Sequence, residues 1–377
     1  MKKIKKTVCL LMCALFLTGC NSDSEGSSIE AQQNDECSVE TSIETSTEIS
    51  TEENVSEEIY EETIFNDGRA NYDYTFNPYA IADIYVESYG EDFLEYYKGF
   101  CDAVLAGEDS FECPDYDTYW KILDAAYVCL PITSDCLDMP EYDENNIVDG
   151  RCDIVYRYSV EEHQNNVREF INKVEEIITT NIQEGDTEFE KALNLYEYCV
   201  YTYFYDYEQF ETGLVSGDKY PGGYRAIMDE TGICQELAAA YAYLLLQVGV
   251  DSDVVYGQNE ETGHAWNIVR INNQYYYMDV TSQLSYMTNP LYFFCVTADE
   301  YAEISEFSLE THSICSSSNI DATVYDVSDE KYMELRECNF YEVNHDSRCV
   351  VYEGYIYEDI SYDSEDCGEY FEGTVGF

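Results

Sequence analysis

Three short segments in the middle of the chain each carry one member of a thiol-catalysis triad. They are Gly-Ile-Cys-Gln-Glu at 232–236, Gly-His-Ala-Trp-Asn at 263–267 and Tyr-Met-Asp-Val-Thr at 277–281. Cys234 supplies a nucleophile, His264 a base, and Asp279 a carboxylate that can orient the base. These segments constrain the fold strongly, because the three side chains can react together only where a helix and two strands bring them to one point.

The segment that begins at Cys234 predicts a buried helix, since it is rich in alanine and leucine. Its apolar residues recur at helical spacing, at Leu237, Ala240, Tyr241, Leu244, Leu245 and Val248. Gly249 is a natural C-terminal stop. Cys234 would then lie in the first turn, where unpaired backbone N–H groups and the helix dipole favour a thiolate. The same N–H groups could stabilise an oxyanion.

The residues after this helix predict a strand and then a β-hairpin. Residues 252–257, 264–271 and 274–281 are the expected strands, and Asn272-Asn273 is a turn signal between the last two. His264 at the head of one strand and Asp279 near the end of its partner would lie side by side. The carboxylate would then hold the imidazole in the tautomer that accepts the thiol proton.

This arrangement resembles the transglutaminase-like superfamily of papain-like thiol enzymes over roughly residues 185–300. The order Cys, His, Asp matches, and so do Gly-x-Cys, His-Ala-Trp-Asn and Asp-Val-Thr after an aromatic run. A helix beginning near Glu190 also resembles the one that precedes the nucleophile in bacterial members. The chain departs from the pattern at Ser282-Gln283, where an aromatic residue is common. That difference concerns the wall of the site and leaves the triad unchanged.

The resemblance implies an α+β fold with a papain-like core, in which the nucleophile helix packs on an antiparallel sheet. A helical N-terminal region and a small β-rich C-terminal appendix would flank this core. Tyr224 matches a position that is aromatic in some bacterial members of the family. Together with the Cys234 N–H, it is a candidate hydrogen-bond donor to the oxyanion. Trp266 is expected to form part of the wall of the site.

The implied chemistry is acyl transfer through a thioester, with hydrolysis of a peptide or amide bond as the expected outcome. An amine acceptor would instead make the protein a crosslinking transglutaminase. A third alternative is a non-catalytic surface-binding lipoprotein that retains the fold. A lone cysteine in an apolar helix is usually a buried thiol, so the catalytic interpretation depends on all three residues occurring in order and in matching context.

The N-terminus predicts a lipoprotein signal peptide over residues 1–20. Four lysines precede an apolar run from Val8 to Leu17, and Leu-Thr-Gly-Cys at 17–20 resembles a bacterial lipoprotein processing box. Lipidation of Cys20 would anchor the chain to the outer face of the cytoplasmic membrane. Residues 21–58 contain no aromatic residue, Lys or Arg and are rich in Glu, Ser and Thr, which is typical of a disordered tether.

The remaining chain is divided by its sequence patterns into three regions. Residues 59–182 are expected to be a mainly helical accessory region, 183–302 the transglutaminase-like catalytic domain, and 303–377 a β-rich appendix. Apolar residues at helical spacing between Val160 and Ile178 support a long amphipathic helix in the first of them.

Charge limits the partners that this chain can bind. The formal net charge is −60, and the leader holds four of the 18 basic residues and no acidic ones, so the mature chain would carry −64. Such a polyanion excludes nucleic acid and anionic membrane surfaces as electrostatic partners and attracts cationic peptides, amines or wall polymers. Peptide, protein or cell-wall peptide is the expected substrate class.

Metal and cofactor chemistry is not indicated. No stretch has a calcium-loop spacing and no Cys-x-x-Cys occurs, so we expect neither a metal nor a cofactor. Of the 16 cysteines, 13 follow Cys20, which leaves 12 beside a free Cys234. Export permits disulfides, and Cys129 with Cys136 or Cys338 with Cys349 are close in sequence. The pairing stays open at this level.

We predict that the mature protein is lipidated at Cys20. Mass spectrometry of the N-terminal peptide should show an acylated cysteine, and Cys20→Ser should release the chain from the membrane fraction. An unmodified N-terminus at another residue would contradict the prediction.

Overall fold

The computed structural model describes residues 69–138, 147–215, 220–258, 262–286, 288–305, 307–314, 320, 324–356 and 369–377. The predicted leader with Cys20 and the predicted tether lie outside these residues, so both stay predictions. The described residues belong to one compact unit that begins at Arg69. None of the helices within them is long and apolar enough to cross a bilayer.

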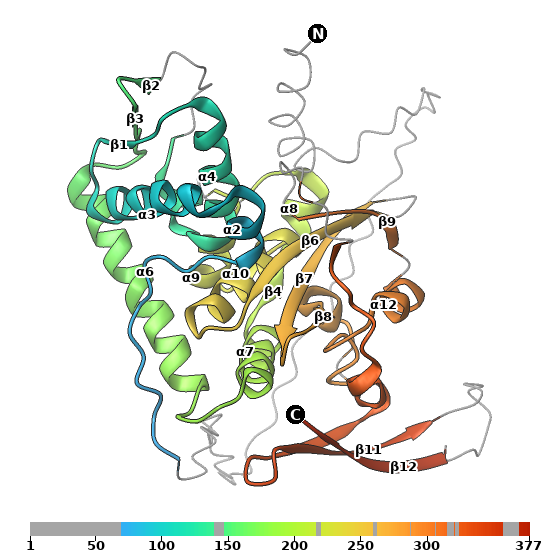
Figure 1. Cartoon of the computed structure of the whole chain (residues 1–377). Helices are drawn as coiled ribbons and strands as arrows, with labels where there is room; N and C mark the ends of the chain where they lie inside the picture. The colour runs from blue at the N-terminus through green and yellow to red at the C-terminus, as the bar shows by residue number, and fades with distance from the viewer. Residues whose placement is uncertain are drawn as a thin grey trace, which may run out of the picture. The chain divides into compact units, whose positions relative to one another are not determined.

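The N-terminal part of this unit is mainly helical, as predicted (Figure 1). Its helices are α2 (Asp83–Tyr89), α3 (Glu91–Ala106), α4 (Tyr116–Cys129), α5 (Ile132–Cys136) and α6 (Val160–Asn181). Three short strands form an antiparallel sheet in the order β1-β3-β2, namely β1 (Ser110–Glu112), β2 (Ile147–Val148) and β3 (Arg151–Asp153). The sequence patterns did not indicate this small sheet.

The central part contains a four-stranded antiparallel sheet. The elements before it are α7 (Glu188–Thr202), β4 (Phe204–Tyr205), α8 (Tyr207–Thr212), α9 (Gly223–Asp229), β5 (Thr231–Gly232) and α10 (Cys234–Gln247). Its strands are β6 (Ser252–Gln258), β7 (Gly263–Ile271), β8 (Gln274–Met278) and β9 (Ser308–Ile314), in the order β8-β7-β6-β9. Asn272 and Asn273 form the β7–β8 turn with φ of 52° and 62°, so the predicted hairpin is confirmed.

Helix α10 is enclosed on all sides. It packs against β6 and β7 and is covered by α4, α7 and α9, and every residue from Glu236 to Gln247 is buried. A helix that is apolar all round is stable only in such a position. The buried Asn267 of β7 also donates from Nδ2 to the Ala238 carbonyl at 2.8 Å, which ties the helix to the sheet. The predicted α+β class, with the helix of Cys234 on an antiparallel sheet, is thus confirmed.

The predicted return strand at 274–281 is too long by three residues. β8 ends at Met278, and Asp279 is the N-cap of the short helix α11 (Val280–Gln283). The Asp279 Oδ1 atom accepts from the Ser282 backbone N–H at 2.9 Å. A capping side chain favours helix initiation over strand continuation, and the aromatic run before Asp279 gave no indication of it.

The C-terminal part contains helix α12 (Ala298–Ser305), the 3₁₀-helix η3 (Glu330–Glu337) and a second antiparallel sheet. Its strands, in the order β10-β11-β12, are β10 (Phe340–Asn344), β11 (Cys349–Ile356) and β12 (Glu369–Gly376). The β-rich appendix is therefore present. Asn339 donates to the Thr288 carbonyl at 3.1 Å, and Tyr341 donates to Glu197 of α7. The proposed domain boundaries at 182 and 302 stay predictions.

The ten cysteines among the described residues are all free thiols. They include Cys129, Cys136, Cys338 and Cys349, so neither pair that is close in sequence forms a disulfide. Only Cys234 and Cys349 in this set are partly exposed, and the other eight are buried.

Candidate active site

Cys234 is the first residue of α10, as predicted, and its side chain is partly exposed. The first turn is held by Glu236, whose Oε2 accepts from the backbone N–H of Ile233 at 3.0 Å. Gly232 allows this contact, because a Cβ at that position would come within 2.8 Å of the Glu236 Cβ. The sulfur therefore lies at the end of a helix where the N–H groups of the first turn have no partner within the helix.

His264 and Asp279 form a buried pair next to this helix end. The His264 Nε2 lies 2.7 Å from the Asp279 Oδ2. The side chain of Cys234 interacts with the imidazole and adds to the upward shift of the His264 pKa. Because Nε2 faces the carboxylate, Nδ1 is the nitrogen available to the sulfur. The structure thus brings the three predicted triad residues together in the order sulfur, imidazole, carboxylate.

The charges of this pair are set by competing effects. Burial lowers the pKa of His264, but the charge and hydrogen bond of Asp279 and the contact with Cys234 outweigh it and raise the pKa to about 10. Burial raises the pKa of Asp279, whereas His264 and Ser282 lower it, and the net shift is downward. The pair is therefore an imidazolium with a carboxylate at neutral pH. An imidazolium next to a sulfur stabilises a thiolate.

Two aromatic residues that the sequence analysis did not identify complete the surroundings of the pair. Tyr301 of α12 is buried and donates its hydroxyl hydrogen to the Asp279 Oδ2 at 2.8 Å. The Phe307 ring stacks on the His264 imidazole with 4.6 Å between centroids and 20° between planes. Neither residue has a local sequence signal, because both follow the triad segments in the chain and reach the site only through the packing of α12.

Trp266 and Tyr224 lie in different places relative to the triad. The Trp266 ring is fully buried and stacks on Tyr301 at 4.6 Å and on His264 at 5.9 Å, so it lies behind the imidazole. The Tyr224 ring packs on Phe170 of α6 at 5.5 Å. Burial raises the pKa of Tyr224, and Asp135 is the main charge that adds to the shift. These contacts place the Tyr224 ring toward α5 and α6, and its oxyanion role stays a prediction.

Tyr205 belongs to the strand pair that leads into the nucleophile turn. It pairs with Gly232 in the parallel β4–β5 ladder, two residues before Cys234. Burial raises the pKa of Tyr205, and the charge of Cys234 is the next largest contribution. The sequence analysis gave this residue no role.

Ser282 and Gln283, where the chain departs from the family pattern, both have polar functions. The Ser282 Oγ is 3.4 Å from the His264 Nε2. The buried Gln283 accepts hydrogen bonds from the Tyr196 hydroxyl at 3.2 Å and from the Phe293 backbone N–H at 3.0 Å. Where an aromatic residue is common in the family, this chain therefore has polar side chains, and their hydrogen bonds hold α11 in place next to the His264–Asp279 pair.

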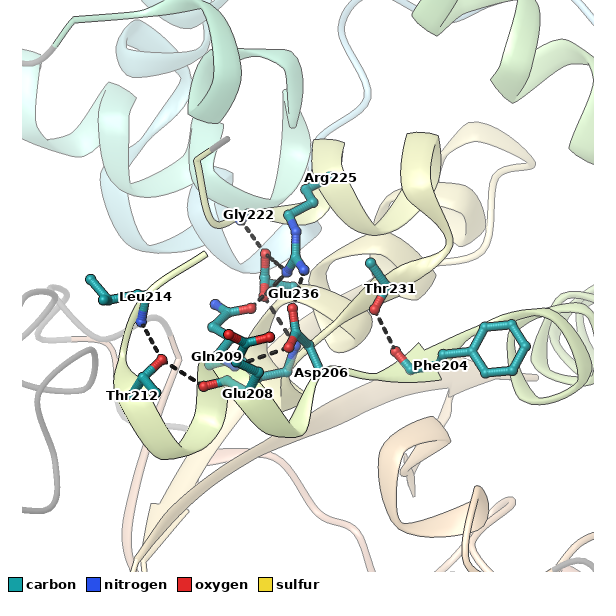
Figure 2. A network of polar contacts seen from close by, with 11 residues as sticks. Phe204, Asp206, Glu208, Gln209, Thr212, Leu214, Gly222, Arg225, Thr231 and Glu236 are labelled. Carbon is teal, nitrogen blue, oxygen red and sulfur yellow. Dashed lines mark hydrogen bonds and ion pairs between the residues drawn. The ribbon is translucent and has the colours of Figure 1, made fainter. Parts of the chain in front are cut away.

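A buried ion-pair network fixes the other side of the nucleophile turn (Figure 2). Arg225 of α9 donates to Glu236 Oε2 at 3.0 Å, to Gln209 Oε1 at 2.6 Å and to Asp206. The backbone N–H of Gly222 donates to Glu236 Oε1 at 2.9 Å. Burial raises the pKa of Glu236, and the Ile233 N–H and Arg225 oppose that shift. One guanidinium thereby joins α8, α9 and α10 around Cys234.

One group of side chains outside the triad has the composition of a metal site. Ligand atoms of Asp186, Glu190 and His345 lie within 4.8 Å of one another. Arg69 forms an ion pair with Asp186 and lies 3.3 Å from the His345 Nε2, while His345 Nδ1 contacts Glu190. A cation would have to displace this guanidinium, so the group acts as an ion-pair cluster that joins the β10–β11 turn to the start of α7.

Comparison with known proteins identifies the class of the central domain. Residues 165–308, which include all three triad residues, match a family model described as a transglutaminase-like domain, DUF553. Residues 165–308 therefore form a transglutaminase-like domain, and the α+β class that was expected for it is confirmed. No curated protein matches the chain.

Two solved structures show limited similarity. One is titled a TGase, at 18% identity over 33% of this chain and 34% of that chain, with a TM-score of 0.26. The other is calcium-bound LapG from Legionella pneumophila, at 14% identity over 46% of this chain and 88% of that chain, with a TM-score of 0.26. The match spans about a third of the length of the TGase.

We predict that the His264–Asp279 pair stabilises the fold in a pH-dependent way. The folded pKa of His264 is about 10, against about 6.5 in an unfolded chain. The stabilisation is complete below pH of about 6.5 and is lost as pH rises through the folded value. Melting temperatures of the parent chain and of His264→Gln at several pH values measure it, because Cys234 contributes to the raised pKa of His264 and must stay in place. Their difference should shrink with rising pH and be lost by about pH 10, and a constant difference would contradict the assignment.

We predict that Arg225→Met is strongly destabilising. Removal of one partner of a buried ion pair costs about 3–5 kcal/mol, because the other charge stays buried. Lys173→Met is the matched control, since Lys173 forms a partly exposed pair with Glu230 at 2.8 Å and should cost at most about 1 kcal/mol. Urea denaturation measures both variants. Equal effects would show that the Arg225 network does not stabilise the nucleophile turn.

Proposed function

We propose that this protein is a cell-surface thiol enzyme that catalyses acyl transfer through a thioester on the triad Cys234, His264 and Asp279. Hydrolysis of a peptide or amide bond is the proposed outcome, with water as the acceptor. Lipidation of Cys20 would hold the enzyme at the outer face of the cytoplasmic membrane. Transfer to an amine, which would crosslink proteins, is the alternative reaction of the same intermediate.

The observation that carries this proposal is the position of the His264 ring between a sulfur and a carboxylate. A buried imidazole that is bound to Asp279 at 2.7 Å and interacts with Cys234 can both accept and return a proton. A structural histidine needs only one such partner. Cys234 is partly exposed and therefore open to substrate. The His264–Asp279 pair is enclosed by Tyr301, which donates to Asp279, and by Phe307, which stacks on His264.

The proposed reaction has two steps. The Cys234 sulfur attacks the carbonyl carbon, the C–N bond breaks, and His264 gives its proton to the departing amine. Water then attacks the thioester carbon and passes a proton to His264, and the C–S bond breaks. The carboxylic acid leaves, and the Cys234 sulfur and protonated His264 are restored. Asp279 keeps the imidazole oriented throughout, and first-turn N–H groups of α10 stabilise the oxyanion.

We predict that Cys234 is much more reactive than Cys349, the other partly exposed cysteine. At mildly acidic pH iodoacetamide should label Cys234 at least about tenfold faster, because the adjacent His264 activates its sulfur as a nucleophile. His264→Ala should remove this difference. Peptide mapping by mass spectrometry measures both rates in one sample. Equal rates in the parent chain would favour the non-catalytic surface-binding alternative.

With an active substrate, the three side chains should act as one unit. Asp279→Ala should lower turnover on the order of 10⁴-fold, and Cys234→Ala/His264→Ala should be little worse than Cys234→Ala alone. Release of free acid or formation of an amide with an added amine distinguishes hydrolysis from crosslinking. Full activity of Cys234→Ala would refute the thiol mechanism.

A further inference from the structure

Helix α8, which follows strand β4, carries exposed aromatic rings. Tyr207 and Phe210 of α8 are 67% and 46% exposed. Both rings contact Tyr205, at centroid distances of 4.9 Å and 6.0 Å. Tyr205 in turn pairs with Gly232, two residues before Cys234. An aromatic surface therefore extends from the strand pair that leads into the nucleophile turn onto the outer side of α8.

Carboxylates alternate with these rings on the same helix. Glu208 and Glu211 are exposed neighbours of Tyr207 and Phe210. We call Tyr205, Tyr207, Glu208, Phe210 and Glu211 the α8 surface. Aromatic faces and carboxylates both attract ammonium and guanidinium groups, and the rings also offer apolar area to a substrate side chain.

The position of α8 is fixed, which suits a docking surface. Gln209, on the inner side of the helix, is buried and accepts a hydrogen bond from Arg225 at 2.6 Å. Asp206 caps the helix by accepting from the Gln209 N–H at 2.9 Å. The ion-pair network that holds the nucleophile turn thus also holds α8 (Figure 2).

We propose that the α8 surface is the docking site for a basic polypeptide segment of the substrate, which carries lysine or arginine beside apolar side chains. This assignment rests on the proposed thiol chemistry, since it names the substrate class for that site. Charge complementarity selects this occupant: the chain has a net charge of −60. Residues 21–58 of the chain itself are acidic and contain no Lys or Arg, so they would be repelled.

The test uses the full chain with Cys234→Ala, which binds without turnover. The probe is a fluorescein-labelled peptide of alternating lysine and phenylalanine, and its counterpart alternates glutamate and phenylalanine. Fluorescence anisotropy gives the dissociation constants. The lysine peptide should bind and the glutamate peptide should not. Equal binding of both, or of neither, would overturn the proposal.

Substitutions on α8 then locate the binding. Tyr207→Ala/Phe210→Ala should weaken binding of the lysine peptide about fivefold to tenfold, because each exposed cation–π contact contributes on the order of twofold to fivefold. Phe204→Ala is the matched control: Phe204 is 71% exposed and lies in the same segment, but its ring points away from α8 in Figure 2. Equal weakening by both variants would overturn the assignment to α8.

The charge contribution is tested separately. Glu208→Gln/Glu211→Gln should weaken binding about threefold to tenfold and reduce its salt dependence. Glu161→Gln/Glu162→Gln removes the same charge from exposed positions of α6 and should have no effect. Equal losses would indicate attraction by the net charge alone, which contradicts a site. Self-association that disappears in Tyr207→Ala/Phe210→Ala would assign the surface to a second copy of the chain instead.

Failure of this proposal can be told apart from failure of the proposed function. Rapid alkylation of Cys234 in the parent chain tests the thiol chemistry and does not require the peptide. If Cys234 is reactive, the bound lysine peptide should slow its alkylation in the parent chain. This protection should be lost in Tyr207→Ala/Phe210→Ala and retained in Phe204→Ala. Unchanged alkylation with bound peptide would show that the peptide docks away from the site.

Discussion

The buried carboxylate of Asp279 is the interaction on which the rest of the site depends. Its two oxygens receive three hydrogen bonds, from His264, Tyr301 and the Ser282 backbone N–H. A carboxylate without such partners would be costly to bury. The same residue ends β8 and begins α11, so the backbone geometry of the core determines where the imidazole lies. The pairing lowers the pKa of one partner and raises that of the other, which keeps both charged.

A second buried carboxylate, that of Glu236, fixes the nucleophile from the opposite side. It caps the start of α10 and is balanced by Arg225, which also holds Gln209. Burying a charge pair contributes little net stability, but it specifies one arrangement, because any other leaves a charge unpaired. Two buried polar groups therefore position Cys234. The Glu236–Arg225 pair holds its backbone in the first turn of α10, and Asp279 orients His264, its proposed base.

The surface around this rigid centre carries the features that would select a substrate. Acidic residues outnumber basic ones throughout the chain, whereas exposed aromatic rings gather on α8. Net charge raises the local concentration of cationic polymers around the protein without selecting a site on its surface. In the proposed docking site the rings of Tyr207 and Phe210 would supply the positional contact, because α8 is held by the network that also holds the first turn of α10.

The sequence by itself determined the core helix and hairpin and picked out the three candidate triad residues. An apolar helix, two strand segments and an Asn-Asn turn between them each have a local pattern, and Cys234, His264 and Asp279 lie at or next to the ends of these elements. Tertiary structure decided what supports them. Tyr301, Phe307 and Arg225 have no local signal, because a tyrosine or arginine is assigned to the site only by the element packed against it. The extra residues predicted for β8 were wrong for a related reason: Asp279 uses its side chain to cap α11 and to hold His264, and both partners are defined only when the chain has folded.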